Sequence, residues 1–141
     1  MLSLKSSHFL TAGATGFGLL AGMAIAGMTG PSEHKGLAVE ALGKLDPGMI
    51  QTQTGLEGYF MQLRAITIEP GGQIAQHSHE NRPGLVKVIS GEWTEGTPEG
   101  ETVFPADASK AIYEQADTVH WVYNHGDEPA TAIVCDLTPA G

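Results

Sequence analysis

The chain has little cysteine and few basic residues. Cys135 is the single cysteine among 141 residues, and one thiol cannot form an internal disulfide. Seven Lys and Arg side chains face sixteen Asp and Glu side chains, for a formal net charge of −9. Binding to nucleic acid or to anionic membrane surfaces needs clustered basic side chains. The composition therefore argues against both kinds of partner.

Charged residues are missing altogether between positions 6 and 32, where small and apolar residues dominate. Two interpretations fit. Residues 1–26 form a signal peptide ending at the Ala24-Ile25-Ala26 cleavage pattern, or residues 9–28 form an uncleaved membrane anchor of about 20 residues. The many Gly, Ala and Thr residues gain little from lipid, which favours the signal peptide. Either interpretation predicts a periplasmic or extracellular location, and any membrane attachment only through this segment.

Residues 27–55 are predicted to be a linker. It contains four apolar residues that could form a loose helical stripe of one or two turns before Asp46-Pro47-Gly48 breaks the pattern: Leu37, Val39, Leu42 and Leu45. His34 lies in this segment, and we expect it to be solvated.

Residues 56–138 are predicted to form a single all-β domain. Short runs rich in β-branched and aromatic residues are each bounded by Gly, Pro or other turn residues. About eight strands separated by such turns are typical of a β-sandwich or β-barrel. The expected strands cover residues 59–69, 73–79, 85–90, 91–95, 102–104, 111–114, 118–124 and 130–137.

Histidines carry the clearest chemical signal in the chain. His77 and His79 are two residues apart at the end of an expected strand, so their side chains share one face. With His120 from a neighbouring strand, they predict a site of three imidazole nitrogens with open coordination positions. The alternative is a chance pair that faces solvent on an edge strand.

The spacing around these histidines resembles the two motifs of the cupin family. Five residues separate Gly71 from His77-x-His79 and Gly91 follows a strand, while His120 stands four residues before Asn124. The resemblance covers residues 56–138. It implies an antiparallel jelly-roll β-barrel that holds a divalent metal such as Fe, Mn, Zn, Ni or Cu, and it is consistent with a homodimer.

One departure from the family pattern concerns its acidic ligand. The family places a glutamate four or five residues after the second histidine, where this chain has Pro83 and Gly84. Glu80 should point away from the site in a regular strand, and Gln73 could face inward but is a weak ligand. The three histidines are therefore carried over, whereas the glutamate is not, and a metal-free barrel remains an alternative.

Two further residues are candidates for the site. Asn124 could orient a histidine from outside the ligand shell, or it could start the following turn through an Asx hydrogen bond. Arg82, three residues after His79, could bind a substrate carboxylate, or it could pair with a surface acid such as Glu80.

Two functions follow from these residues. The first is a metal-dependent enzyme that oxygenates, isomerises or decarboxylates a small molecule. The second is a non-catalytic periplasmic module that binds or senses a small molecule, since this fold does not decide function. No general acid or base can be placed beside the histidines from the sequence, so whether the protein is an enzyme stays open at this point.

Overall fold

The computed structural model describes residues 27–141, which form eight strands and one short helix. The predicted signal peptide or anchor, residues 1–26, lies outside the described residues. Within residues 27–141, no helix has the length and apolarity that crossing a membrane requires. The elements are β1 (Lys35–Leu45), α1 (Pro47–Thr54), β2 (Tyr59–Ser78), β3 (Gly84–Ser90), β4 (Glu92–Thr97), β5 (Gly100–Pro105), β6 (Ile112–Glu114), β7 (Val119–Tyr123) and β8 (Ala130–Pro139).

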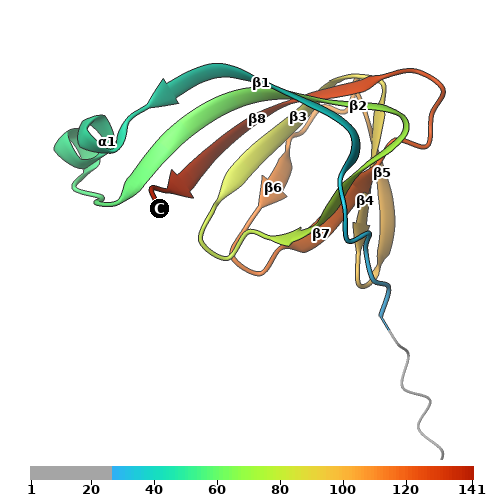
Figure 1. Cartoon of the computed structure of the whole chain (residues 1–141), viewed down its shortest axis with the longest axis horizontal. Helices are drawn as coiled ribbons and strands as arrows, with labels where there is room; N and C mark the ends of the chain where they lie inside the picture. Colours follow the sequence, from blue (N-terminus) through green and yellow to red (C-terminus); the bar gives the residue numbers. More distant parts are fainter. Residues whose placement is uncertain (1–26) are drawn as a thin grey trace, which may run out of the picture.

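All strands belong to one antiparallel sheet. Its order is β5-β4-β7-β2-β8-β3-β6, and β1 pairs with β2 beside this path. The sheet curls into a half-barrel (Figure 1). The prediction of a mostly β, antiparallel fold is confirmed at this level.

Strand β2 is 20 residues long and joins the two parts of the sheet. Residues Tyr59–Ile68 pair with β8, and residues Gln73–Ser78 pair with β7. Between these parts Gly71 has a φ of 68°, a conformation that glycine adopts without strain. The two strands expected over residues 59–69 and 73–79 are therefore one bent strand, and its second half places His77 opposite His120.

The predicted helical stripe between Leu37 and Leu45 is wrong, because these residues form β1. A register shift between Ala41 and Gly43 marks a bulge. One extra residue in a strand reverses which side chains face each side of the sheet. Leu37 and Val39 therefore line the concave side, and Leu45 does not. The apolar spacing resembled a helix for this reason.

The predicted break at Asp46-Pro47-Gly48 is instead the start of α1. Asp46 caps the helix by accepting a hydrogen bond from the Met49 backbone N–H at 2.9 Å. Pro47 occupies the first turn, where its missing N–H costs nothing. The helix ends at Gly55, which has a φ of 77°.

The core lies on the concave side of the curled sheet. It is built mainly from aliphatic side chains, among them Ile66, Ile68, Val86, Val122 and Val134. These side chains alternate with residues of the outer face, as strand geometry requires. Some of them, among them Ile66, Val122 and Val134, also line a cavity on the concave side.

Trp121, which is fully buried, lies on the other face of β7 from Val122. Residues 27–31 contribute to its cover, because a side-chain carbon added to Gly30 would overlap the indole ring. The Gly30 N–H donates to Gln76 Oε1 at 2.7 Å, and Met28 N–H donates to Pro98 O at 3.1 Å. The start of the predicted linker is therefore packed against the sheet.

Candidate metal centre

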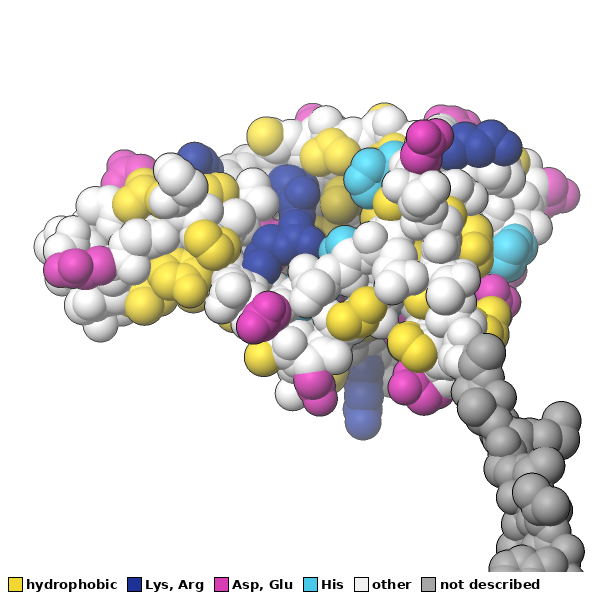
Figure 2. Space-filling model, turned by 60° about the horizontal axis from the view of Figure 1, so that its bottom comes forward, with side chains coloured by type: hydrophobic (Ala, Val, Ile, Leu, Met, Phe, Trp, Pro, Cys, Tyr) yellow, Lys and Arg dark blue, Asp and Glu magenta, His cyan; other side chains and the backbone are white. Residues whose placement is uncertain are grey.

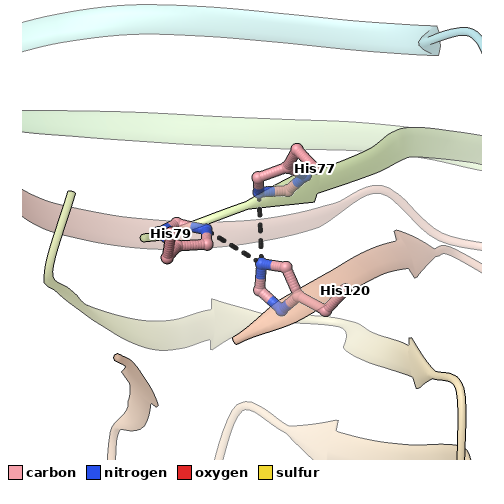
Figure 3. Close-up of side chains that lie close together, drawn as sticks. All are labelled: His77, His79 and His120. Atoms are coloured by element: carbon pink, nitrogen blue, oxygen red, sulfur yellow. Dashed lines mark hydrogen bonds between the residues drawn. The ribbon is translucent and has the colours of Figure 1, made fainter. Parts of the chain in front are cut away.

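The three predicted histidines meet at one point. His77 lies near the end of β2, His79 follows that strand, and His120 lies on β7 directly opposite His77. One ring nitrogen from each lies within 4.8 Å of the other two, and the rings face one another (Figure 3). The convergence expected from the sequence is confirmed.

The distances suit a shared ion. Nε2 of His120 lies 3.1 Å from Nε2 of His79 and 3.1 Å from Nε2 of His77. Nitrogens bound to one ion at about 2.0–2.1 Å, with angles of about 90–110°, lie roughly 2.8–3.4 Å apart. Nε2 of His120 is therefore at ligand spacing from both other nitrogens, and all three lie within 4.8 Å of one another.

The opposite ring nitrogens fix which nitrogen carries the proton. Nδ1 of His77 lies 2.8 Å from the Ala75 carbonyl, and Nδ1 of His79 lies 2.9 Å from the Arg82 carbonyl. Nδ1 of His120 lies 2.6 Å from Oε1 of Glu95. Carbonyl and carboxylate oxygens accept hydrogen bonds, so Nδ1 donates in each ring. Each neutral ring then directs an unprotonated Nε2 toward the common point, which is the state that binds a metal.

Burial favours the neutral form of two of these rings. Loss of solvation lowers the pKa of His77 and the pKa of His79 from 6.5 to about 4. A neutral imidazole keeps the lone pair that a metal needs. In this tautomer the Nε2 lone pair of His120 faces those of His77 and His79 at 3.1 Å, and such lone pairs repel unless a cation lies between them, so the residues present fit a divalent metal.

Glu114 is a site residue that the sequence did not indicate. Its Oε2 lies 3.3 Å from Nδ1 of His79, and its Oε1 lies 3.7 Å from Nε2 of His120. Burial raises the pKa of Glu114 from 4.5 to about 6. The strand pairing of β6 with β3, which brings Glu114 to this place, joins segments that are far apart in the chain and leaves no local signal.

Two arginines meet at a buried aspartate beside the histidines. Asp136 is 2% exposed and lies 2.6 Å from a guanidinium nitrogen of Arg64 and 3.7 Å from one of Arg82. A second nitrogen of Arg82 lies 3.5 Å from Nε2 of His79. Arg82 therefore reaches the edge of the site, and its acidic neighbour is Asp136 and not Glu80.

A cavity of about 290 Å³ opens beside the histidines. Figure 2 shows basic and histidine side chains gathered where this face is hollowed. The polar lining comes from the three histidines, His34, Arg64, Arg82 and Glu114, and the apolar lining comes from Leu37, Val39, Ile66, Ile74, Val122 and Val134. A small molecule with an anionic and an apolar part would fit such a lining.

His34 lies at this cavity and is exposed, in agreement with the expectation that it is solvated. Its Nδ1 accepts a hydrogen bond from the Ala75 N–H at 3.0 Å. The same residue, Ala75, holds His77 through its carbonyl. His34 thus lines the cavity without joining the three-histidine cluster.

Asn124 serves the turn and not the histidines. Its side-chain NH₂ donates to the carbonyls of Ile68 and Glu128 at 2.9 and 2.8 Å, and its Oδ1 accepts from the Gly126 N–H at 3.0 Å. Both the amide nitrogen and the amide oxygen of this side chain are thereby hydrogen-bonded to backbone groups. The Asx-turn interpretation describes these contacts, and the orienting role predicted for Asn124 finds no support in them.

The family model of the cupin domain (Cupin_2) matches residues 64–136 of the chain, which is just over half of its length. No curated protein matches the chain.

Several solved structures share the fold. A Cupin_2 domain of an XRE family transcriptional regulator from Enterobacter cloacae superposes with a TM-score of 0.56 and 18% identity, over 74% of this chain and 99% of that chain. A sugar phosphate isomerase from Silicibacter pomeroyi gives 0.53 and 22%, over 73% and 60%. The Cnp3 cupin domain from Schizosaccharomyces pombe gives 0.57 and 11%, over 72% and 64%. At these identities the likeness concerns the fold alone.

Proposed function

This chain belongs to the cupin family, and on that premise we propose that it binds a divalent metal through His77, His79 and His120 and acts on a small anionic molecule beside it. One observation carries the proposal. Three Nε2 atoms, each left without a proton by the hydrogen bond at Nδ1, converge within 4.8 Å of one another, and that of His120 lies 3.1 Å from each of the other two. Histidines that served packing alone would gain nothing from this arrangement.

The reaction would take place in the cavity beside the cluster. Three imidazoles leave coordination positions open toward that space, and a bound divalent ion would polarise a carbonyl or an enediol there. The chemistry we propose is oxygenation, isomerisation or decarboxylation of a small molecule. Solved cupin-fold neighbours include a sugar phosphate isomerase and an oxalate oxidase, although their low identity lends no argument for either substrate.

The charges around the cavity support an anionic substrate. Arg64 and Arg82 contribute two positive charges, and Asp136 and Glu114 contribute two negative ones, so a bound divalent ion would make the site positive overall. Arg82 is the partly exposed member whose second guanidinium nitrogen points to the histidines. A carboxylate or similar group held there would lie next to the metal.

The test of metal binding is elemental analysis of the purified protein after loading with Mn, Fe, Ni, Cu or Zn. We expect about one ion per wild-type chain and none in the double variant His77→Ala, His79→Ala. His125→Ala is the matched control, because that side chain is 58% exposed and lies outside the cluster. Equal metal content in all three proteins, or none in the wild type, would refute the proposal.

We also propose export from the cytoplasm, on the basis of the uncharged N-terminal sequence alone. N-terminal sequencing of the protein isolated from its native host checks this. A start at or near Gly27 is expected for a cleaved signal peptide, whereas an intact start at Met1 in a membrane fraction would indicate an anchor.

A further inference from the structure

Glu114 places a buried carboxylate beside the three histidines. The residue is 6% exposed at the end of β6. Its Oε2 has no hydrogen-bond partner among the described residues, because the nearby Nδ1 of His79 already donates to the Arg82 carbonyl. Buried polar atoms are rarely left in this state without an ion or a water molecule. Oε2 is therefore a buried oxygen with a free lone pair beside the histidines.

Gly84 explains how this carboxylate reaches the site. Gly84 of β3 stands directly opposite Glu114 in the ladder, and Asp136 stands opposite Gly84 on its other side. A side-chain carbon added to Gly84 would collide with the Glu114 carboxylate. Gly84 has no positive φ, so the site uses its missing side chain and not a special backbone conformation.

The balance of charge points to the same carboxylate. Three neutral imidazoles leave both charges of a divalent ion uncompensated in a poorly solvated interior. Asp136 forms ion pairs with Arg64 and Arg82. Glu95 contacts Nδ1 of His120, the ring nitrogen that faces away from the other two histidines. Glu114 is the acidic residue near the metal-facing nitrogens, with Oε1 3.7 Å from Nε2 of His120.

We infer that Glu114 is a fourth ligand of the metal, supplied from β6 through the space that Gly84 leaves empty. The inference rests on the proposed metal binding and adds to it a ligand from another strand. A set of three imidazoles and one carboxylate suits Mn, Fe, Ni or Zn, and it leaves positions for a substrate on the cavity side.

The experiment measures Co²⁺ and Zn²⁺ binding to metal-stripped full-length protein by competition with a chromophoric chelator. Glu114→Gln keeps the shape of the side chain and removes its charge. We expect it to raise the Kd by about 10–100-fold or more and to change the visible absorption of the Co²⁺ form, which reports the ligand set. The double variant Gly84→Glu, Glu114→Ala returns a carboxylate from the opposite strand, and we expect it to recover most of the affinity.

Glu80→Gln is the matched control, since Glu80 is exposed next to His79 and its loss changes the net charge equally. An unchanged Kd for Glu114→Gln would overturn the inference, as would a raised Kd with an unchanged Co²⁺ spectrum. These outcomes differ from failure of the proposed function, in which wild-type protein itself binds no metal. Loss of affinity in Glu114→Gln together with recovery in the double variant would establish the ligand.

Discussion

At the scale of single residues, the ring nitrogens that face away from the metal point decide what the histidines can do. Ala75, Arg82 and Glu95 each hold one Nδ1. A histidine that is fixed in this way cannot rotate to place its other nitrogen at the site. The backbone of β2 and of the loop after it, with the side chain of Glu95, therefore predispose the cluster to bind an ion before one arrives.

The lowered pKa values of His77 and His79 predict how the stability of the metal-free protein depends on pH. Both fall from 6.5 to about 4, so between these values the unfolded chain binds more protons than the folded chain. The free energy of unfolding should then decrease as the pH falls from 6.5 toward 4, by on the order of 1–3 kcal/mol. Urea unfolding of metal-stripped protein at several pH values measures this.

The control is the double variant His77→Gln, His79→Gln, which has no imidazole to titrate at these positions. Glu114 acts with the opposite sign, because burial raises its pKa from 4.5 to about 6, so its contribution lowers the free energy of unfolding as the pH rises from 4.5 through 6. That contribution remains in the variant. An equal pH dependence in the two proteins would contradict the prediction.

Arg82 carries a prediction about ligand binding. Arg82→Gln should weaken binding of acetate to the Co²⁺-loaded protein about ten-fold or more, since a hydrogen bond to a charged group is lost. The fold should persist, because Arg64 still holds Asp136 at 2.6 Å. Titration of acetate, followed by the Co²⁺ absorption, measures the effect. Lys110→Gln, an exposed cation away from the cavity, is the control, and equal weakening in both would show only a change in net charge.

At the scale of elements, the strands from residue 59 onward could be predicted because their signals are local. Gly and Pro mark the turns, and β-branched residues fill the strands between them. β1 could not be predicted, because a bulge near Leu42 disturbs its alternation and its pairing with β2 lies outside the local sequence.

The residues of the site also differ in whether the local sequence indicates them. His77 and His79 share one strand, so their common face follows from the spacing, and the family resemblance supplies His120. Glu95, Glu114 and Arg64 come to the site only through strand pairing across the sheet. No spacing along the chain indicates that pairing, so these three side chains could not be assigned to the site from the sequence.

The pairing of β4 with β7 requires a residue without a side chain at position 96. Gly96 pairs with Trp121 in the ladder, and an added side-chain carbon would overlap the indole ring. Gly96→Ala should therefore lower the free energy of unfolding by about 1–3 kcal/mol through overpacking. Gly43→Ala is the control, since an added carbon there meets nothing within 4 Å. Equal urea midpoints for the two variants would contradict this account of the pairing.

At the scale of the whole molecule, an apolar band crosses the outer face of the sheet. Residues directly opposite one another in a ladder share a face, and the register aligns Leu63, Cys135, Leu85 and Tyr113 across four strands. Leu45, Met61 and Leu137 are aligned in the same way beside them. Leu85 is 47% exposed and Tyr113 is 63% exposed. A contiguous exposed patch of this kind is typical of an interface between proteins.

This band predicts the homodimer that the family resemblance suggested. Two copies that buried the band against each other would remove exposed leucine, methionine and tyrosine side chains from water, and a stable interface needs roughly 1,200–2,000 Å² in total. Light scattering should give twice the chain mass for the wild type and one chain mass for Leu85→Glu, because a buried unpaired carboxylate is costly.

Val103→Glu is the matched control for that substitution, since Val103 is equally apolar, is 53% exposed and lies on β5 outside the band. It should remain a dimer and keep the same metal content. A wild type that stays monomeric at about 100 µM, a concentration well above that needed for a micromolar complex, would show that the band does not join two copies of this chain. Loss of the dimer in both variants would place the interface elsewhere. Because the band and the cavity occupy opposite faces of the same strands, Leu85→Glu should leave metal binding intact, and that measurement separates a failed interface from a failed fold.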